Sequence, residues 1–175
     1  MLIVPAAAGP AVPRFERLVV GVDFTAASHA GIAHALAAVE PAGRVTLVHA
    51  LPPHLAARTP LTWRRSVAEA HRRSVTGEAW RQLQEAVATA QPRTASVRAR
   101  VAIGRTSVEI ERIAAELEAD LIVLGVRRRG AIGRAVLGAT AIDVLRSSRR
   151  PVLAVPEHAV AATASPRVAP SRLAA

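Results

Sequence analysis

The segment GVRRRGAIGRAVLGATAIDVLRSSRRPVLAVP, residues 125–156, contains the features on which the predicted fold depends. It leaves an apolar run, crosses a loop rich in arginine and glycine, continues with amphipathic spacing and ends in a second apolar run. This order predicts a strand, a loop, a helix and another strand. Strand, helix and strand in succession form the repeating unit of a parallel sheet.

The same alternation extends back to residue 17. Apolar, β-rich runs predict strands at 17–23, 44–50, 96–104, 120–126 and 151–156. Stretches with helical spacing lie between them, at 24–41, 61–90, 106–119 and from near Thr140. The alternation predicts an α/β fold with an open five-stranded parallel sheet and helices on both faces.

Length and composition favour one domain with two flexible ends. A chain of 175 residues is long enough for one hydrophobic core and short for two. Residues 1–13 are apolar and broken by prolines, and residues 157–175 mix alanine, proline, serine and arginine without a period. We therefore expect a domain at 14–156, between a flexible N-terminal segment at 1–13 and a flexible C-terminal tail at 157–175.

The expected location is the cytoplasm. The first residues lack the positive charges of a secretory signal, and no apolar run is long enough to cross a bilayer. Cysteine is absent, which fits a reducing compartment. We expect neither export nor a membrane partner.

The positive charge suggests anionic ligands. Lys+Arg outnumber Asp+Glu by 23 to 13, a net charge of +10. Arginines at 64, 65, 72, 73 and 81 predict a basic stripe on the long helix, and RSSRR at 146–150 adds a cluster. The alternative function is therefore a basic module that binds nucleic acid or a partner protein and no nucleotide. Without base-reading groups, nucleic-acid binding is expected to be weak and nonspecific at most.

The sequence does not support an enzyme. His29 and His34 are five residues apart, whereas metal ligands on a helix prefer a spacing of three or four. Neither a G-x-S-x-G elbow nor a Walker-type lysine loop occurs. We expect no catalytic residue and no metal site, while slow ATP hydrolysis stays open.

The fold class indicates where a small ligand binds. In an open α/β sheet, ligands bind outside the carboxyl ends of the strands. Asp23 ends the first predicted strand and Gly125 the fourth. If these strands are neighbours, both residues border one crevice, and the helix from near Thr140 directs its N–H groups toward it.

Four blocks of the chain resemble the universal stress protein family. They are VVGVDFTAASHAGIAHAL (19–36), VTLVHAL (45–51), ADLIVLGVRRRGAIGRAVLGATAIDVLR (119–146) and RRPVLAVP (149–156). The resemblance implies the strand order 3-2-1-4-5 of the adenine nucleotide alpha hydrolase-like folds and a stress-response or regulatory role. It also implies a homodimer that forms through the last strand, residues 151–156.

Members of this family divide into adenine-nucleotide binders and non-binders. The binders carry a glycine, two residues, a glycine, nine residues, and a glycine followed by serine or threonine. Counted from Gly125, the last glycine falls on Gly138, but Arg128 stands at the second glycine and Ala139 at the hydroxyl position, with Thr140 one place late. This pattern predicts weakened or altered phosphate recognition, with Arg127, Arg128 or Arg129 as substitute phosphate ligands.

The resemblance implies a degenerate cleft for ATP or AMP. Its contacts are expected at the strand ends and in the loop before the last helix: Gly21, Asp23, Ala50, Leu124, Gly125, Arg128, Gly138, Ala139 and Thr140.

Several of these residues also have purely structural interpretations. Asp23 is equally suited to cap the helix that follows it. Thr140 and Asp143 form a capping-box-like pair, which we prefer to a phosphate contact for Thr140. Trp63 and Trp80 are interpreted as anchors of the core or of a dimer.

Overall fold

The computed structural model describes residues 15–53, 65–90, 95–127 and 138–157. The predictions for residues 1–13, Trp63, Arg64, Arg128, Arg129 and the tail from residue 158 lie outside the described residues.

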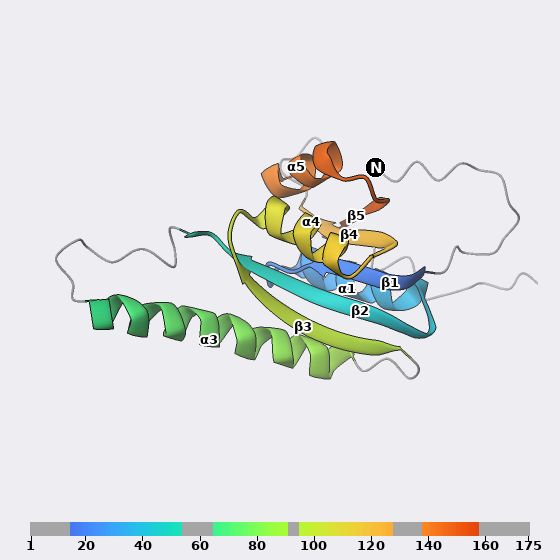
Figure 1. Cartoon of the computed structure of the whole chain (residues 1–175). Coiled ribbons are helices and arrows are strands. Elements are labelled where there is room, and N and C mark those ends of the chain that lie inside the picture. Colours follow the sequence, from blue (N-terminus) through green and yellow to red (C-terminus); the bar gives the residue numbers. More distant parts are fainter. Residues whose placement is uncertain (1–14, 54–64, 91–94, 128–137, 158–175) are drawn as a thin grey trace, which may run out of the picture.

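Five strands alternate with helices in the predicted order (Figure 1). The strands are β1 (Phe15–Gly21), β2 (Val39–Leu51), β3 (Ser96–Ile103), β4 (Leu121–Val126) and β5 (Val152–Pro156). The helices are α1 (Ala26–Ala38), α3 (Arg65–Ala90), α4 (Thr106–Glu116) and α5 (Ala139–Ser147). The strands form one parallel sheet of order β3-β2-β1-β4-β5. The predicted fold class and strand order are confirmed.

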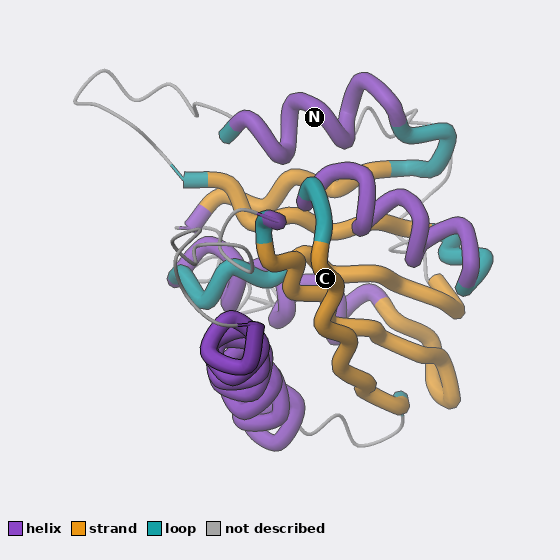
Figure 2. The backbone as a smooth tube through the Cα atoms, turned by 60° about the vertical axis from the view of Figure 1, so that its left-hand side comes forward, coloured by secondary structure: helices purple, strands orange, loops and turns teal. Residues whose placement is uncertain are grey.

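Helices cover both faces of the sheet, as two views 60° apart show (Figure 2). On β1, Leu18 and Val20 pack into the core beneath α1 and α3. The intervening Val19 packs into a second core beneath α4 and α5, with Ile113 and Val144. Successive side chains of a strand point to opposite faces, so a continuous apolar run is needed where both faces are covered.

Strand β2 begins earlier than the sequence indicated. We expected it to start at residue 44, but Phe15 already pairs with Val39. The register then shifts, and Arg17 pairs with Arg44. Ala42 within this shift has a left-handed backbone, with φ of 66°. The residues between Val39 and Arg44 form an irregularity in the ladder, which lacks the alternation on which the prediction relied.

Trp80 is not a core anchor. Its side chain is 44% exposed on α3, whereas Ala79 and Leu83 of the same helix are buried. The interpretation of Trp80 as a core residue is therefore wrong, and its alternative role in a dimer stays a prediction.

Candidate functional site

The carboxyl ends of β1 and β4 meet, as the sequence predicted. Gly21 pairs with Leu124 in the sheet ladder. Beyond the strands, Arg127 Nη2 donates a hydrogen bond to Asp23 Oδ2 at 3.1 Å. This ion pair connects the segment that follows β1 to the segment that follows β4. Both side chains remain more than half exposed, at 56% for Asp23 and 59% for Arg127.

Asp23 supports the cap of α1 without being the cap itself. The N-cap residue is Thr25, whose hydroxyl accepts a hydrogen bond from the Ser28 N–H at 3.4 Å. The Thr25 N–H and hydroxyl both donate to Asp23 Oδ1. The interpretation of Asp23 as the N-cap is therefore wrong. The helix begins at Ala26, three residues after Asp23, so the adjacent threonine takes the capping position.

Phe24 gives the turn after β1 its shape. Its φ of 60° is left-handed, a conformation that is uncommon and strained for a bulky residue. Its ring lies 4.6 Å from the ring of His49 on β2, centroid to centroid. His49 Nδ1 in turn donates to the Val22 carbonyl oxygen at 2.7 Å. These contacts over-determine the turn, and they hold the residues around Asp23 in place.

Asp23 is a carboxylate at neutral pH. Partial burial raises the pKa of Asp23, but the hydrogen bonds from Thr25 and Arg127 outweigh this effect and hold the pKa below its ordinary value. An ionised carboxylate only accepts hydrogen bonds, so the strand end presents an acceptor and a negative charge.

Helix α5 begins at the same edge of the sheet without a side-chain cap among the described residues. Its N-cap is Gly138, and its first backbone hydrogen bond runs from the Ile142 N–H to the Gly138 carbonyl oxygen. The N–H groups of residues 139–141 thus have no partner within the helix. They and the positive end of the helix dipole favour an anion at this position.

The predicted capping box at Thr140 is wrong. Thr140 lies inside the first turn of α5, because the helix already begins at Ala139. Asp143 accepts a hydrogen bond from Arg105 Nη2 at 2.7 Å, across to the start of α4. Thr140 and Asp143 have the spacing of a capping box, but an N-cap residue must precede the helix and Thr140 lies within it.

Gly125, which matches the family pattern, and Gly21, at the end of β1, are both closely packed. A Cβ at residue 125 would lie 2.2 Å from the Ala27 carbonyl oxygen, because α1 packs directly against β4. A Cβ at Gly21 would lie 2.7 Å from Leu124 Cδ2. Gly125 is therefore explained without a ligand, because its contacts are backbone atoms, whereas the atom nearest Gly21 is the end of a flexible side chain.

Gly138 differs from these two glycines. Among the described residues, no atom lies within 4 Å of a Cβ built on it. Its φ of −63° is one that any residue adopts. The packing of the described residues gives no reason for a glycine at this place.

The predicted site residues have the following positions. Ala50 and Leu124 are buried, and Leu124 packs with Ile110 in the core beneath α4 and α5. Gly138 and Ala139 are exposed, and Thr140 is half-buried. Sequence reasoning treated Arg127 as one of three equivalent loop arginines and missed its pairing with Asp23. Its position directly after β4, the neighbour of β1, was the available signal.

The model of the universal stress protein family matches residues 14–156. The chain belongs to the universal stress protein family.

Solved structures share the fold of this universal stress protein at low sequence identity. UspA from Lactobacillus plantarum is 23% identical with a TM-score of 0.58, and the match covers 81% of this chain and 98% of that one. A universal stress protein in complex with cAMP is 22% identical with a TM-score of 0.57, covering 82% and 98%. One from Archaeoglobus fulgidus in complex with dAMP is 21% identical with a TM-score of 0.50, covering 83% and 99%. A search of curated proteins finds no match.

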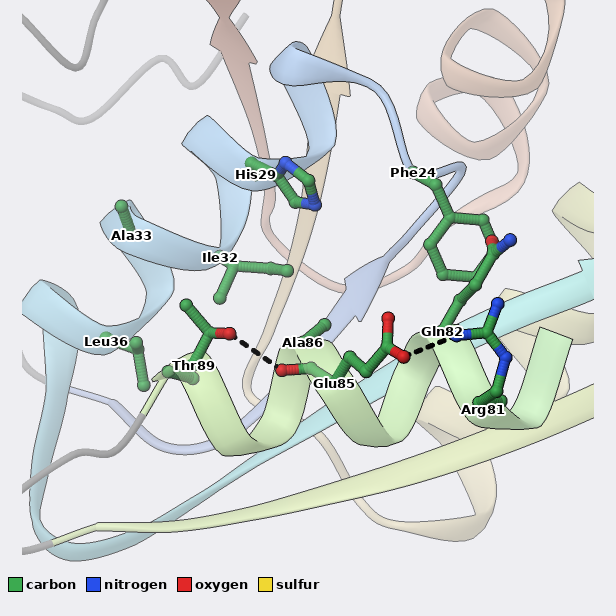
Figure 3. A pocket seen from close by; sticks show the side chains of 11 residues that line it. Phe24, His29, Ile32, Ala33, Leu36, Arg81, Gln82, Glu85, Ala86 and Thr89 are labelled. Carbon is green, nitrogen blue, oxygen red and sulfur yellow. Dashed lines mark hydrogen bonds and ion pairs between the residues drawn. The ribbon is translucent and has the colours of Figure 1, made fainter. Parts of the chain in front are cut away.

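A separate groove of about 780 Å³ lies between α1 and α3 of this universal stress protein (Figure 3). Figure 3 shows Ile32 and Leu36 of α1 facing Ala86 and Thr89 of α3. Arg81, the basic side chain of the groove, forms ion pairs with Glu78 and Glu85. Phe24 also lines the groove, so the turn that carries Asp23 borders it.

The predicted basic surfaces are partly neutralised. On α3, the ion pairs of Arg81 with two glutamates reduce the positive charge of the expected stripe. In the cluster at 146–150, Arg150 Nε donates to the Ala119 carbonyl oxygen at 2.9 Å and serves the fold. These contacts weaken the case for a phosphate-backbone surface.

No group of three or more histidine, aspartate or glutamate side chains in the described residues is arranged to hold a metal ion. None of the described helices is both long and apolar enough to cross a bilayer.

Proposed function

We propose that this universal stress protein is a non-catalytic, regulatory protein that binds an adenine nucleotide, ATP or AMP, in the crevice beyond β1 and β4. The observation that carries the proposal is the start of α5. At the same sheet edge as the Asp23 carboxylate, α5 begins after its N-cap Gly138 with no side-chain cap from the described residues. The N–H groups at the start of α5 are suited to a phosphate, and the Asp23 carboxylate is suited to the hydroxyl donors of a ribose.

The relatives support the choice of an adenine nucleotide. Universal stress proteins of the same fold have been solved with cAMP and with dAMP. In this chain the resemblance puts Asp23 at the ribose and adenine end, and Ala50 and Leu124 at the wall, while Gly21 is a further expected contact. The buried Ala50 and Leu124 keep that wall apolar.

The phosphate end departs from the family's binders. Gly138 and the N–H groups of residues 139–141 are suited to phosphate oxygens. Ala139 brings no hydroxyl to them, and Thr140, one residue later, is half-buried. We expect backbone groups and arginine side chains to hold the phosphates, with weaker or altered affinity, and no resident metal ion.

The described crevice offers little for catalysis. Its ionised side chain, Asp23, is already held by Thr25 and Arg127, and its pKa is lowered, which makes it a poor general base. This supports a binding role in which the protein responds to a nucleotide without consuming it.

Calorimetry with ATP, AMP and adenosine tests the proposal, because the three ligands differ only in phosphate. If the loop is a weakened phosphate site, Arg128→Gly with Ala139→Ser should tighten ATP binding about tenfold or more, since a hydrogen bond to a charged oxygen contributes about 1.5–3 kcal/mol. If Arg128 is itself a phosphate ligand, the single variant Arg128→Gly should weaken ATP binding and lower its salt dependence. No binding of any of the three ligands by the natural or the double-variant protein would refute the proposal.

We also propose a homodimer that pairs through β5. This strand has β4 on one side and is the end of the sheet in the described residues. The Ile122 N–H donates to the Pro151 carbonyl oxygen, so the alternation of a parallel ladder directs the N–H groups of Val152 and Ala154 to the free side. An open edge of this kind is usually paired or covered.

A further inference from the structure

The hydrogen-bonding capacity of Asp23 is largely occupied within the chain. Oδ1 accepts from the Thr25 N–H and hydroxyl, and Oδ2 accepts from Arg127. A carboxylate offers about four acceptor positions, so three intramolecular donors leave little room for the two hydroxyls of a ribose. A ribose that donates both of its hydroxyls to Asp23 therefore has to displace one of these donors.

The three donors differ in how easily they leave. The Thr25 hydroxyl caps α1 through the Ser28 N–H, and the Thr25 N–H belongs to the same turn, so moving either would disturb the start of the helix. Arg127 has a long side chain that is 59% exposed and pairs with a partner that is 56% exposed. Exposed ion pairs contribute little to stability, so Arg127 is the donor that a ligand displaces.

We propose that Arg127 makes the crevice selective for phosphorylated ligands by covering Asp23 until a phosphate draws the guanidinium away. The inference rests on the proposed nucleotide site and adds a residue that chooses among its ligands. Arg127 directly follows β4, where the chain leaves toward the start of α5. It contacts Asp23, at the ribose end of the proposed site, and precedes the helix proposed to hold the phosphates.

The selectivity follows from what each ligand offers the displaced guanidinium. Adenosine breaks the ion pair and gives Arg127 only water in return. A nucleotide also breaks the ion pair, but the planar guanidinium can bind its phosphate through two hydrogen bonds, more strongly than it binds one exposed carboxylate oxygen. The same side chain thus opposes nucleosides and favours nucleotides.

The variant Arg127→Gln separates the two effects in calorimetry with adenosine and ATP. Adenosine should bind about two- to fivefold more tightly, since the competing ion pair is gone. ATP should bind about tenfold more weakly, since a charge-assisted hydrogen bond is lost. The matched control is Arg17→Gln, which makes the same charge change in the exposed Arg17–Glu118 ion pair, away from Asp23. It should leave both affinities unchanged.

A double-mutant cycle tests whether Arg127 acts through Asp23. In an Asp23→Asn background the guanidinium has no carboxylate to cover, so Arg127→Gln should no longer tighten adenosine binding. Amide chemical-shift titration measures the adenosine affinities if they are too weak for calorimetry. A gain of the same size in both backgrounds would overturn the inference.

The outcomes distinguish this inference from the proposed function. If the natural protein binds neither ATP nor adenosine and Arg127→Gln binds neither, the nucleotide site itself is refuted. If the natural protein binds ATP but Arg127→Gln leaves both affinities unchanged, or shifts them in the same direction, only the role of Arg127 is refuted. Opposite shifts for the two ligands support both.

Discussion

At the scale of single residues, Gly125 has two possible reasons to be a glycine, and the structure identifies one of them. The family pattern suggested close approach to a phosphate. The structure places the Ala27 carbonyl oxygen 2.2 Å from a would-be Cβ, and the Ser28 nitrogen at 2.5 Å. Backbone atoms cannot move aside as a flexible side chain does. The glycine is therefore required before any ligand is considered.

We predict that Gly125→Ala lowers the free energy of unfolding by about 2 kcal/mol or more, because the added methyl group forces α1 and β4 apart. Urea denaturation followed by circular dichroism measures the change. The control is Gly77→Ala on α3, where nothing lies within 4 Å of the new Cβ. This control should stabilise the protein by about 0.5–1 kcal/mol, since alanine is the better helix former. Equal effects of the two substitutions would contradict the packing explanation.

At the scale of the helix and strand elements, the start of α5 couples stability to anion binding. Its N-cap glycine provides no hydrogen bond to the N–H groups of the first turn. Natural helices usually satisfy one of these donors with a serine, threonine, aspartate or asparagine. Because Gly138 has no side chain to cap the helix, the N–H groups of the first turn of α5 stay available for another partner.

We predict that Gly138→Asp stabilises the fold by about 0.5–1 kcal/mol and weakens ATP binding by about tenfold or more. The carboxylate caps the helix and favours its dipole, but it occupies the donors and repels a phosphate. Urea denaturation and calorimetry measure the two effects. Gly77→Asp is the control for net charge, because it adds the same charge on an exposed part of α3. A more stable variant with unchanged ATP affinity would show that the phosphate lies elsewhere.

The elements were predictable from the sequence to different degrees. The five strands followed from apolar runs such as that of β4, because both faces of the strand are buried. Their order in the sheet followed from the family resemblance. The early start of β2 was not predictable from apolar runs, because the pairing of Phe15 with Val39 is a tertiary contact. The caps of α1 and α5 were misassigned because several neighbouring side chains are capable of capping. The backbone alone decides which one precedes the helix.

The same limit applies to the candidate site. Strand ends and the resemblance located Asp23 and the loop after β4. They did not separate Arg127 from the arginines that follow it, since composition is the same for all three. Which guanidinium reaches Asp23 depends on the register of β1 against β4, which places Gly21 beside Leu124.

At the scale of the whole molecule, the sheet has an edge suited to a second copy. Val152 and Val155 of β5 are only 7% and 2% exposed, so charged substitutions there would test folding rather than association. Ala154 is more informative, because its N–H faces away from β4 in the ladder.

We predict that Ala154→Pro converts a dimer into a monomer while the subunit stays folded. Proline removes the outward N–H on which pairing of the edge depends, and edge strands tolerate proline where that group faces solvent. Sedimentation velocity at micromolar protein measures the oligomeric state, and circular dichroism checks the fold. A natural protein that sediments as a monomer, or a proline variant that remains dimeric, would contradict pairing through β5.

The contact between α1 and β4 also determines which side of the crevice adjusts to a ligand. A Cβ at Gly31 of α1 would lie 3.4 Å from the Gly125 nitrogen of β4. The two backbones are therefore in close contact here, with no side chain between them that could adjust by changing rotamer. By contrast, α5 meets α4 through side chains that can change rotamer: Val144 and Ile113 in the core, and the Arg105–Asp143 ion pair at the surface. We therefore expect the α1 side to act as a fixed reference point, and ligands of different length to be accommodated by displacement of α5.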